Sequence, residues 1–151
     1  MKILILVVLI FWSNLTHATT KAVCELMREE ANDIQPQLPI DVDYSTVLLG
    51  ITVIYSSSIC QITYKYIIDS QKYAHFLSSE NGLTERENAL FILSTEGKVA
   101  IEKQFQDMGK IAKESELGEL AKHPGIKLIY RHEFDDPAVG IFETTAVDTT
   151  K

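Results

Sequence analysis

Residues 47–68 read VLLGITVIYSSSICQITYKYII. Branched and aromatic residues lie on both sides of three serines, a pattern that predicts two antiparallel strands joined by a tight turn. In the second strand one face holds Gln61, Thr63 and Lys65. The alternate positions share the other face, which we expect to point inward because all are apolar or aromatic: Cys60, Ile62, Tyr64, Tyr66 and Ile68.

The segments around this hairpin have helical periodicity. A helix is predicted over residues 20–34, capped by Thr20 and followed by Pro36, because its apolar residues recur at steps of three and four. Residues 70–123 predict helices and loops, with a capping box from Thr84 to Glu87. A further apolar stripe is formed by Ile101, Phe105, Met108 and Ala112.

Two more strands are expected over residues 126–134 and 139–147, with Asp135-Asp136-Pro137 and Gly140 in the turn between them. The order of elements is then helix, hairpin, helices, hairpin. This order predicts an α+β fold, an antiparallel sheet of about four strands with helices packed mainly on one face. We find no linker or internal repeat, so residues 19–151 form a single predicted domain.

The N-terminus has the pattern of an export signal. Lys2 precedes ten apolar residues, 3–12, which are too few to cross a bilayer but typical of the core of a signal peptide. Thr16 and Ala18 place small residues at the −3 and −1 positions of a cut before Thr19. The predicted mature chain therefore lacks residues 1–18 and has no transmembrane segment, and we expect it in the periplasm or outside the cell.

The chain has two cysteines, Cys24 and Cys60. In an oxidising compartment an even number of cysteines favours a disulfide, while two buried free thiols are the alternative. Neither cysteine has a histidine nearby in sequence, and there is no C-x-x-C spacing. A catalytic thiol or a structural zinc site is therefore not indicated.

Composition excludes several classes of function. The 151 residues carry 14 basic and 21 acidic side chains, a net charge of −7, which becomes −8 when Lys2 leaves with the leader. Without clustered lysine and arginine the chain does not resemble a nucleic-acid-binding protein. It has no G-x-S-x-G, P-loop, dinucleotide, EF-hand or H-E-x-x-H motif, so we expect no cofactor and no metal.

A few residues remain as weak binding candidates. His132 and Asp135 belong to the string His132-Glu-Phe-Asp-Asp136, which could hold a cation or an acid/base pair but more often is a solvated turn. Asp41 and Asp43 would project from the same side of an extended chain, a pattern that surface polarity also explains. Aromatic side chains on a sheet can bind a protein partner, although strand propensity accounts for them too; the candidates are Tyr64, Tyr66 and Tyr130.

Three segments carry a resemblance. Residues 38–46 read L-P-x-x-V-D-x-x-T, residues 63–66 read T-Y-x-Y, and residues 125–130 read G-h-x-h-x-Y, where h is apolar. This order resembles a group of small exported bacterial envelope proteins that are largely uncharacterised. The resemblance implies a bacterial envelope location. It does not extend to the cysteines, since Cys60 lies in a predicted strand rather than before the final hairpin.

Together these observations favour a periplasmic or secreted, non-enzymatic protein that binds a protein partner in the cell envelope, such as a component of an assembly or secretion machine. An acidic surface favours a basic or neutral partner. One alternative is an inhibitor or immunity protein that blocks a periplasmic enzyme. A second alternative is a hydrolase with an unrecognised site near His132.

Overall fold

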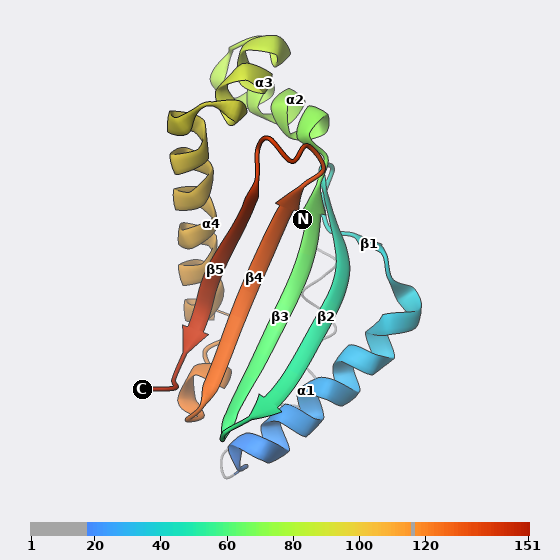
Figure 1. The fold of residues 1–151 in the computed structure, drawn as a ribbon, viewed down its shortest axis with the longest axis vertical. Helices are drawn as coiled ribbons and strands as arrows, with labels where there is room; N and C mark the ends of the chain where they lie inside the picture. The colour runs from blue at the N-terminus through green and yellow to red at the C-terminus, as the bar shows by residue number, and fades with distance from the viewer. Residues whose placement is uncertain (1–17, 116) are drawn as a thin grey trace.

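The computed structural model describes residues 18–115 and 117–151. The predicted leader, residues 1–18, lies outside the described residues except for Ala18. The chain forms four α-helices in this part, α1 (Thr20–Ile34), α2 (Ser70–Asn81), α3 (Glu85–Leu93) and α4 (Thr95–Ser115), with 3-10 turns at Gln35–Gln37 and Leu120–Lys122. The strands are β1 (Ile40–Asp41), β2 (Thr46–Ser56), β3 (Ile59–Ile68), β4 (Ile126–Phe134) and β5 (Ile141–Asp148) (Figure 1).

The strands form one sheet in the order β1-β2-β3-β4-β5. The α+β class is confirmed, but the sheet differs from the prediction in two ways. It has five strands, because the two-residue β1 pairs with Val47 and Leu48 of β2. It is also mixed, because β3 and β4 pair in parallel while the other pairs are antiparallel.

The parallel pair follows from the length of α4. This helix has 21 residues and so extends about 30 Å, the length of a strand of nine residues. It therefore returns the chain along the sheet to the end where β3 begins, and β4 starts there beside Cys60 (Figure 1). A hairpin connection would have reversed the direction of the strand, whereas a helical crossover preserves it.

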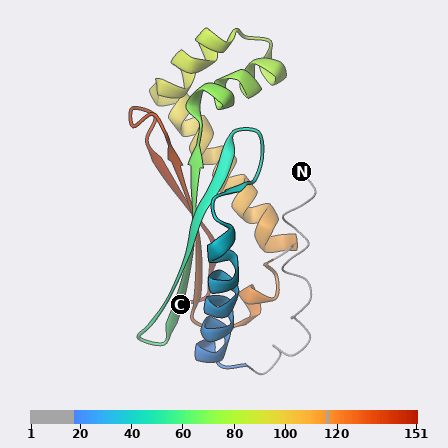
Figure 2. The same cartoon turned by 90° about the vertical axis from the view of Figure 1, so that its right-hand side faces the viewer.

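Helices cover one face of the sheet. Figure 2 shows α1 and α4 on the same side of the strands, which confirms the prediction that the helices pack mainly on one face. Leu48, Ile62 and Leu128 point to this side and are buried. The opposite face carries the polar residues of β3 and ion pairs such as Lys65–Glu133 at 3.4 Å and Arg131–Glu143 at 2.6 Å.

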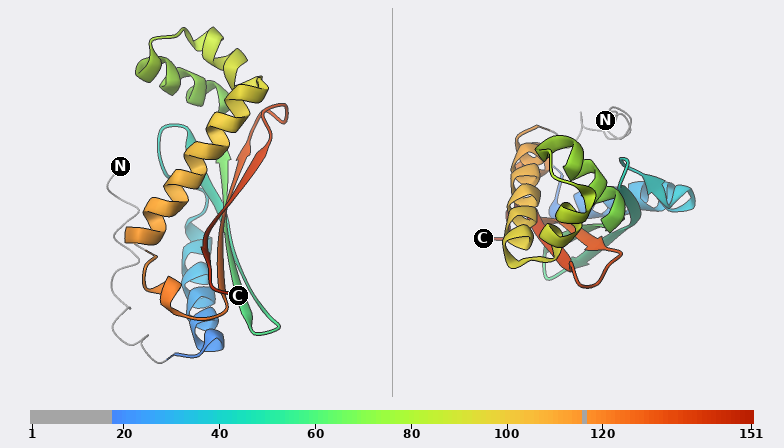
Figure 3. Two further views of the ribbon diagram at one scale, coloured as in Figure 1. Left: turned by 90° about the vertical axis from the view of Figure 1, so that its left-hand side faces the viewer. Right: turned by 90° about the horizontal axis from the view of Figure 1, so that it is seen from above.

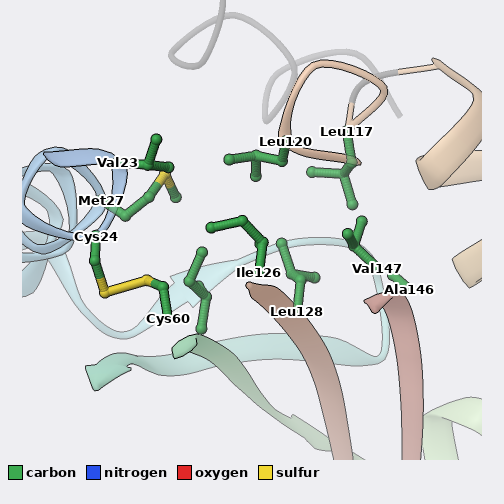
Figure 4. Close-up of a cluster of buried hydrophobic side chains, with 11 residues drawn as sticks. Val23, Cys24, Met27, Cys60, Leu117, Leu120, Ile126, Leu128, Ala146 and Val147 are labelled. Carbon is green, nitrogen blue, oxygen red and sulfur yellow. A yellow bond between two sulfur atoms is a disulfide. The ribbon is translucent and has the colours of Figure 1, made fainter. Parts of the chain in front are cut away.

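The disulfide Cys24–Cys60 lies inside the core, with both residues fully buried (Figure 4). It joins α1 to β3, as the inward-facing alternation of β3 predicts. Figure 4 shows the apolar side chains of the same core cluster. They come from α1 (Val23 and Met27), from the segment between α4 and β4 (Leu117 and Leu120), from β4 (Ile126 and Leu128) and from β5 (Ala146 and Val147). The capping residue lies one position earlier than predicted, because Thr19, not Thr20, accepts the hydrogen bond of the Ala22 amide.

Helices α2 and α3 form a hairpin that projects beyond the ends of β3 and β4 (Figures 1 and 3). The predicted capping box at Thr84 and Glu87 starts α3. The fully buried Asn88 binds α2 through Asn81, whose side-chain amide donates to Asn88 Oδ1 at 2.8 Å. Tyr73 of α2 is buried and donates its hydroxyl to Gln104 of α4 at 2.8 Å. The hairpin is thus fixed to the rest of the domain by both apolar and polar contacts.

Candidate functional site

Four of the five predicted binding residues come together on the helix-facing side of β3 and β4. The register of these parallel strands pairs Tyr64 with Tyr130 and Tyr66 with His132. Their rings form a continuous row: the centroids of Tyr64 and Tyr130 are 5.8 Å apart, those of Tyr130 and Tyr66 6.2 Å, and those of Tyr66 and His132 5.1 Å. All four residues are buried or half-buried.

Burial changes the protonation chemistry of this row. Desolvation lowers the pKa of His132 to about 4, opposed by the charge of Asp43, so the imidazole is neutral at pH 7. Its Nδ1 is buried and has no hydrogen-bond partner in the described structure. Burial raises the pKa of Tyr64 to about 12, with a smaller contribution from Glu30, and raises that of Tyr66 still further. The row is therefore an uncharged aromatic layer at neutral pH.

The hydrolase hypothesis near His132 has no support in this arrangement. His132 faces the helices, whereas Glu133 points to the opposite side of the sheet and pairs with Lys65. Asp135 lies beyond the strand and binds Ser70. Among the described residues, no three histidine, cysteine, aspartate or glutamate side chains are placed to hold a metal ion.

Asp135, the fifth predicted residue, belongs to a different part of the molecule. Its Oδ1 accepts the backbone N–H of Ser70 at 2.8 Å and the Ser70 hydroxyl at 2.5 Å, which attaches the β4–β5 turn to the start of α2. Burial alone would raise the pKa of Asp135, but these hydrogen bonds outweigh it and the pKa lies below its usual value. The carboxylate therefore stays ionised.

Asp135 lines an open pocket with a volume of about 480 Å³. The pocket lies between the β1–β2 loop, the ends of β2 and β3, and the first turn of α2. Its walls carry four carboxylates and one ammonium group, and its apolar part is formed by Val47 and Ile67; the charged residues are Asp41, Asp43, Asp69, Asp135 and Lys72. We call this feature the acidic pocket. The sequence predicts that Asp41 and Asp43 project from the same side, but it does not predict that Asp69 and Asp135 lie beside them.

Three of the four carboxylates bind neighbouring groups of the fold. Asp43 accepts the Ser45 amide at 2.8 Å, and Asp69 caps α2 by accepting the Lys72 amide at 2.9 Å. Among the described residues, Asp69 is the only one of the four whose carboxylate lies within ion-pair distance of a cation, the Lys72 ammonium at 3.7 Å. Because most of these partners are neutral donors, they hold the side chains in place without cancelling their charge. The acidic pocket is therefore a fixed region of negative charge.

The most unusual surface was not predicted from the sequence. Large apolar side chains are exposed around the α2–α3 hairpin and the start of α4, with exposed fractions of 62% for Leu90 and 61% for Val99. We call this set the apolar tip: Phe76, Leu83, Leu90, Phe91, Leu93 and Val99. The sequence feature that could have predicted this surface is the apolar run Ala89-Leu-Phe-Ile-Leu93. Consecutive residues of a helix are 100° apart and cannot all face the core, so some side chains of such a run must be exposed. Only Asn88 and Ile92 of α3 are buried.

The fold class is thus an α+β domain with a single helical layer and a projecting helical hairpin. No family model matches the chain, and no curated protein is significantly similar to it. Among solved structures, one similar chain is a "putative secreted protein" from Pseudomonas aeruginosa, with 14% sequence identity over 80% of this chain and 87% of that chain, and a TM-score of 0.43. A likeness at this level says nothing about what this chain does.

One further observation bears on location. The disulfide fits a protein that folds in an oxidising compartment outside the cytoplasm. No helix in residues 18–115 and 117–151 combines the length and the apolar character needed to cross a membrane.

Proposed function

We propose that the protein is exported to the periplasm or secreted and acts there, without catalysis, by binding another protein through the apolar tip. The observation that carries this proposal is the exposure of six large apolar side chains in one region, five on the α2–α3 hairpin and one, Val99, at the start of α4. A concentration of exposed large apolar side chains in one region of a folded protein often marks a site of interaction. The export half of the proposal rests on the leader pattern and on the disulfide.

The aromatic row is a less suitable binding surface. His132 is buried, and its ring is covered on one side by Phe105 of α4. Leu90 and Val99, by contrast, are already exposed to solvent. The predicted role of Tyr64, Tyr66 and Tyr130 in binding is therefore replaced in this proposal by a role in packing, and the apolar tip takes over the binding role.

Site-specific photocrosslinking tests the proposal. A photoreactive amino acid is placed at Leu90 of the full-length protein, expressed in its native host, and in a matched control at Thr52, an exposed residue of β2. β2 belongs to the sheet, whereas α3 projects beyond the upper end of the strands (Figure 1). We expect a discrete crosslinked partner from position 90 and none from position 52. If the crosslinked partners are components of an envelope machine, the protein has an accessory role. If the partner is a single basic enzyme, the protein is an inhibitor. Crosslinks of equal yield and identity from both positions would contradict the proposal.

A further inference from the structure

We infer that the partner presents a segment in which apolar side chains flank a lysine or arginine: the apolar side chains pack on the apolar tip and the cation enters the acidic pocket. This inference rests on the proposed function and specifies the chemistry of the partner. The partner would contact both the apolar tip and the acidic pocket, which lie next to each other along α2 and offer apolar surface and negative charge.

The two surfaces are continuous along α2. Lys72 lines the acidic pocket, and Phe76 of the apolar tip follows four residues later, so both lie on the same face of the helix. Tyr44 joins them from the β1–β2 loop: it lines the pocket, is 62% exposed, and its ring centroid lies 6.0 Å from that of His75. A single bound segment can therefore contact the pocket and the tip together.

The charge of the pocket selects a cation. Four aspartates face one lysine, and the chain as a whole has a net charge of −7. Asp41 is exposed and accepts no hydrogen bond from the described residues, so its charge is available to a ligand. Val47 and Ile67 offer apolar surface to the methylene groups of a lysine or arginine side chain. The Tyr44 ring already lies near one cation, since the Lys72 Nζ is 5.8 Å from its centroid.

The same charge disfavours two other occupants of this surface. An anionic membrane surface attracts clustered lysine and arginine, and the pocket beside α2 instead carries four aspartates and one lysine. A second copy of this chain would bring its own acidic pocket toward the first in a symmetric contact, which costs electrostatic energy. A cationic protein segment satisfies both the apolar and the charged parts of the surface.

Peptide binding tests the inference. The probes are a 12-residue peptide built from Leu-Leu-Lys repeats and a matched peptide with glutamate in place of each lysine, titrated against the disulfide-bonded protein by calorimetry at low and high salt. We expect the lysine peptide to bind, to lose affinity with added salt, and to bind at least tenfold more tightly than the glutamate peptide. Asp41→Lys should weaken its binding about tenfold or more, and Asp41→Asn less.

The control is Glu29→Lys on the exposed part of α1, which changes the net charge by the same amount away from the pocket. It should leave affinity within about twofold of wild type, and circular dichroism confirms that each variant is folded. The inference would be overturned if the protein bound both peptides equally well, or if Asp41→Lys and Glu29→Lys lost the same affinity for the lysine peptide. It would also be overturned if the protein bound anionic vesicles or a second copy of itself in preference to the lysine peptide. In those cases a specific crosslink from position 90 would still support the proposed function, because crosslinking detects a partner at the apolar tip whatever the charge of that partner.

Discussion

The imidazole of His132 stacks on the ring of Phe105, with centroids 4.0 Å apart and planes inclined by 5°. On its other side it stacks on Tyr66 at 5.1 Å. His132 therefore lies between α4 and the sheet, and its charge state affects how the helix packs. Within residues 18–115 and 117–151, Asp43 is the only charged side chain that shifts its pKa, and the aromatic groups facing it are Tyr66, Tyr130 and Phe105.

Acidification is expected to destabilise the protein through His132. Because its pKa is about 4 in the folded protein and about 6.5 in the unfolded chain, the unfolded state binds more protons between these values. The stabilising effect of the neutral imidazole is complete above pH 6.5 and is lost as the pH falls toward 4, by up to about 3 kcal/mol. Urea denaturation at a series of pH values measures this change in the free energy of unfolding.

The variant His132→Phe isolates this contribution. Phenylalanine preserves the stacking with Phe105 and Tyr66 but cannot be protonated. We expect its free energy of unfolding to match or exceed that of wild type at pH 7 and to decrease less between pH 6.5 and 4.5. An identical pH dependence in the two proteins would show that His132 does not cause the acid sensitivity.

The disulfide should account for a large part of the stability. Cys24 and Cys60 are 36 positions apart, and closing a loop of this length stabilises a fold by about 3–4 kcal/mol in the chain-entropy model. Replacing both cysteines by alanine should lower the free energy of unfolding by about this amount, measured with urea at pH 7. Reducing agent should destabilise wild type and leave the double variant unchanged. Equal stability of the oxidised wild type and the double variant would contradict this prediction.

Gly97 sits at the junction between α3 and α4, where a Cβ atom would lie 1.9 Å from the carbonyl oxygen of Phe91. Since that oxygen belongs to the backbone, Gly97→Ala must move one helix relative to the other, at a cost of about 3 kcal/mol. Gly50→Ala is the matched control, because a Cβ there meets no atom within 4 Å. Thermal unfolding should show a clearly lower Tm for the first variant only, and similar Tm values for both would refute this account of the junction.

The mature protein should begin at Thr19. The side chain of Thr19 caps α1, and the Thr20 hydroxyl donates to the Pro124 carbonyl at 2.8 Å, so a cut before Thr19 preserves both contacts, whereas a cut beyond Thr20 removes them. N-terminal sequencing of the protein recovered from the periplasm or the medium measures this directly. A protein that keeps Met1, or that starts beyond Thr20, would contradict the prediction.

Local patterns predicted the individual elements well. The helix over residues 20–34 and the strands over 59–68 and 126–134 have the predicted ends, because apolar periodicity and the flanking turn residues act on neighbouring positions. The inward face of β3 was predicted in the same way. Met108 was the exception in the predicted stripe of α4: it is exposed, while Gly109 packs against Thr144.

Features that depend on distant segments were not predictable. The parallel pairing of β3 and β4 depends on how far α4 carries the chain, and the two-residue β1 is too short to have a pattern of its own. The acidic pocket assembles Asp41, Asp69 and Asp135 from three separate segments. The apolar tip is visible in the sequence as apolar residues, but only the tertiary structure determines which of them remain exposed.

The affinity of the crosslinked partner for tip variants tests the central claim most directly. Once the partner from position 90 is purified, its Kd is measured for wild type, for Leu90→Asp and for the control Thr52→Asp, both of which are substitutions at exposed positions. Binding through the apolar tip predicts at least a tenfold higher Kd for Leu90→Asp and an unchanged Kd for Thr52→Asp. An unchanged Kd for a folded Leu90→Asp variant would contradict the account.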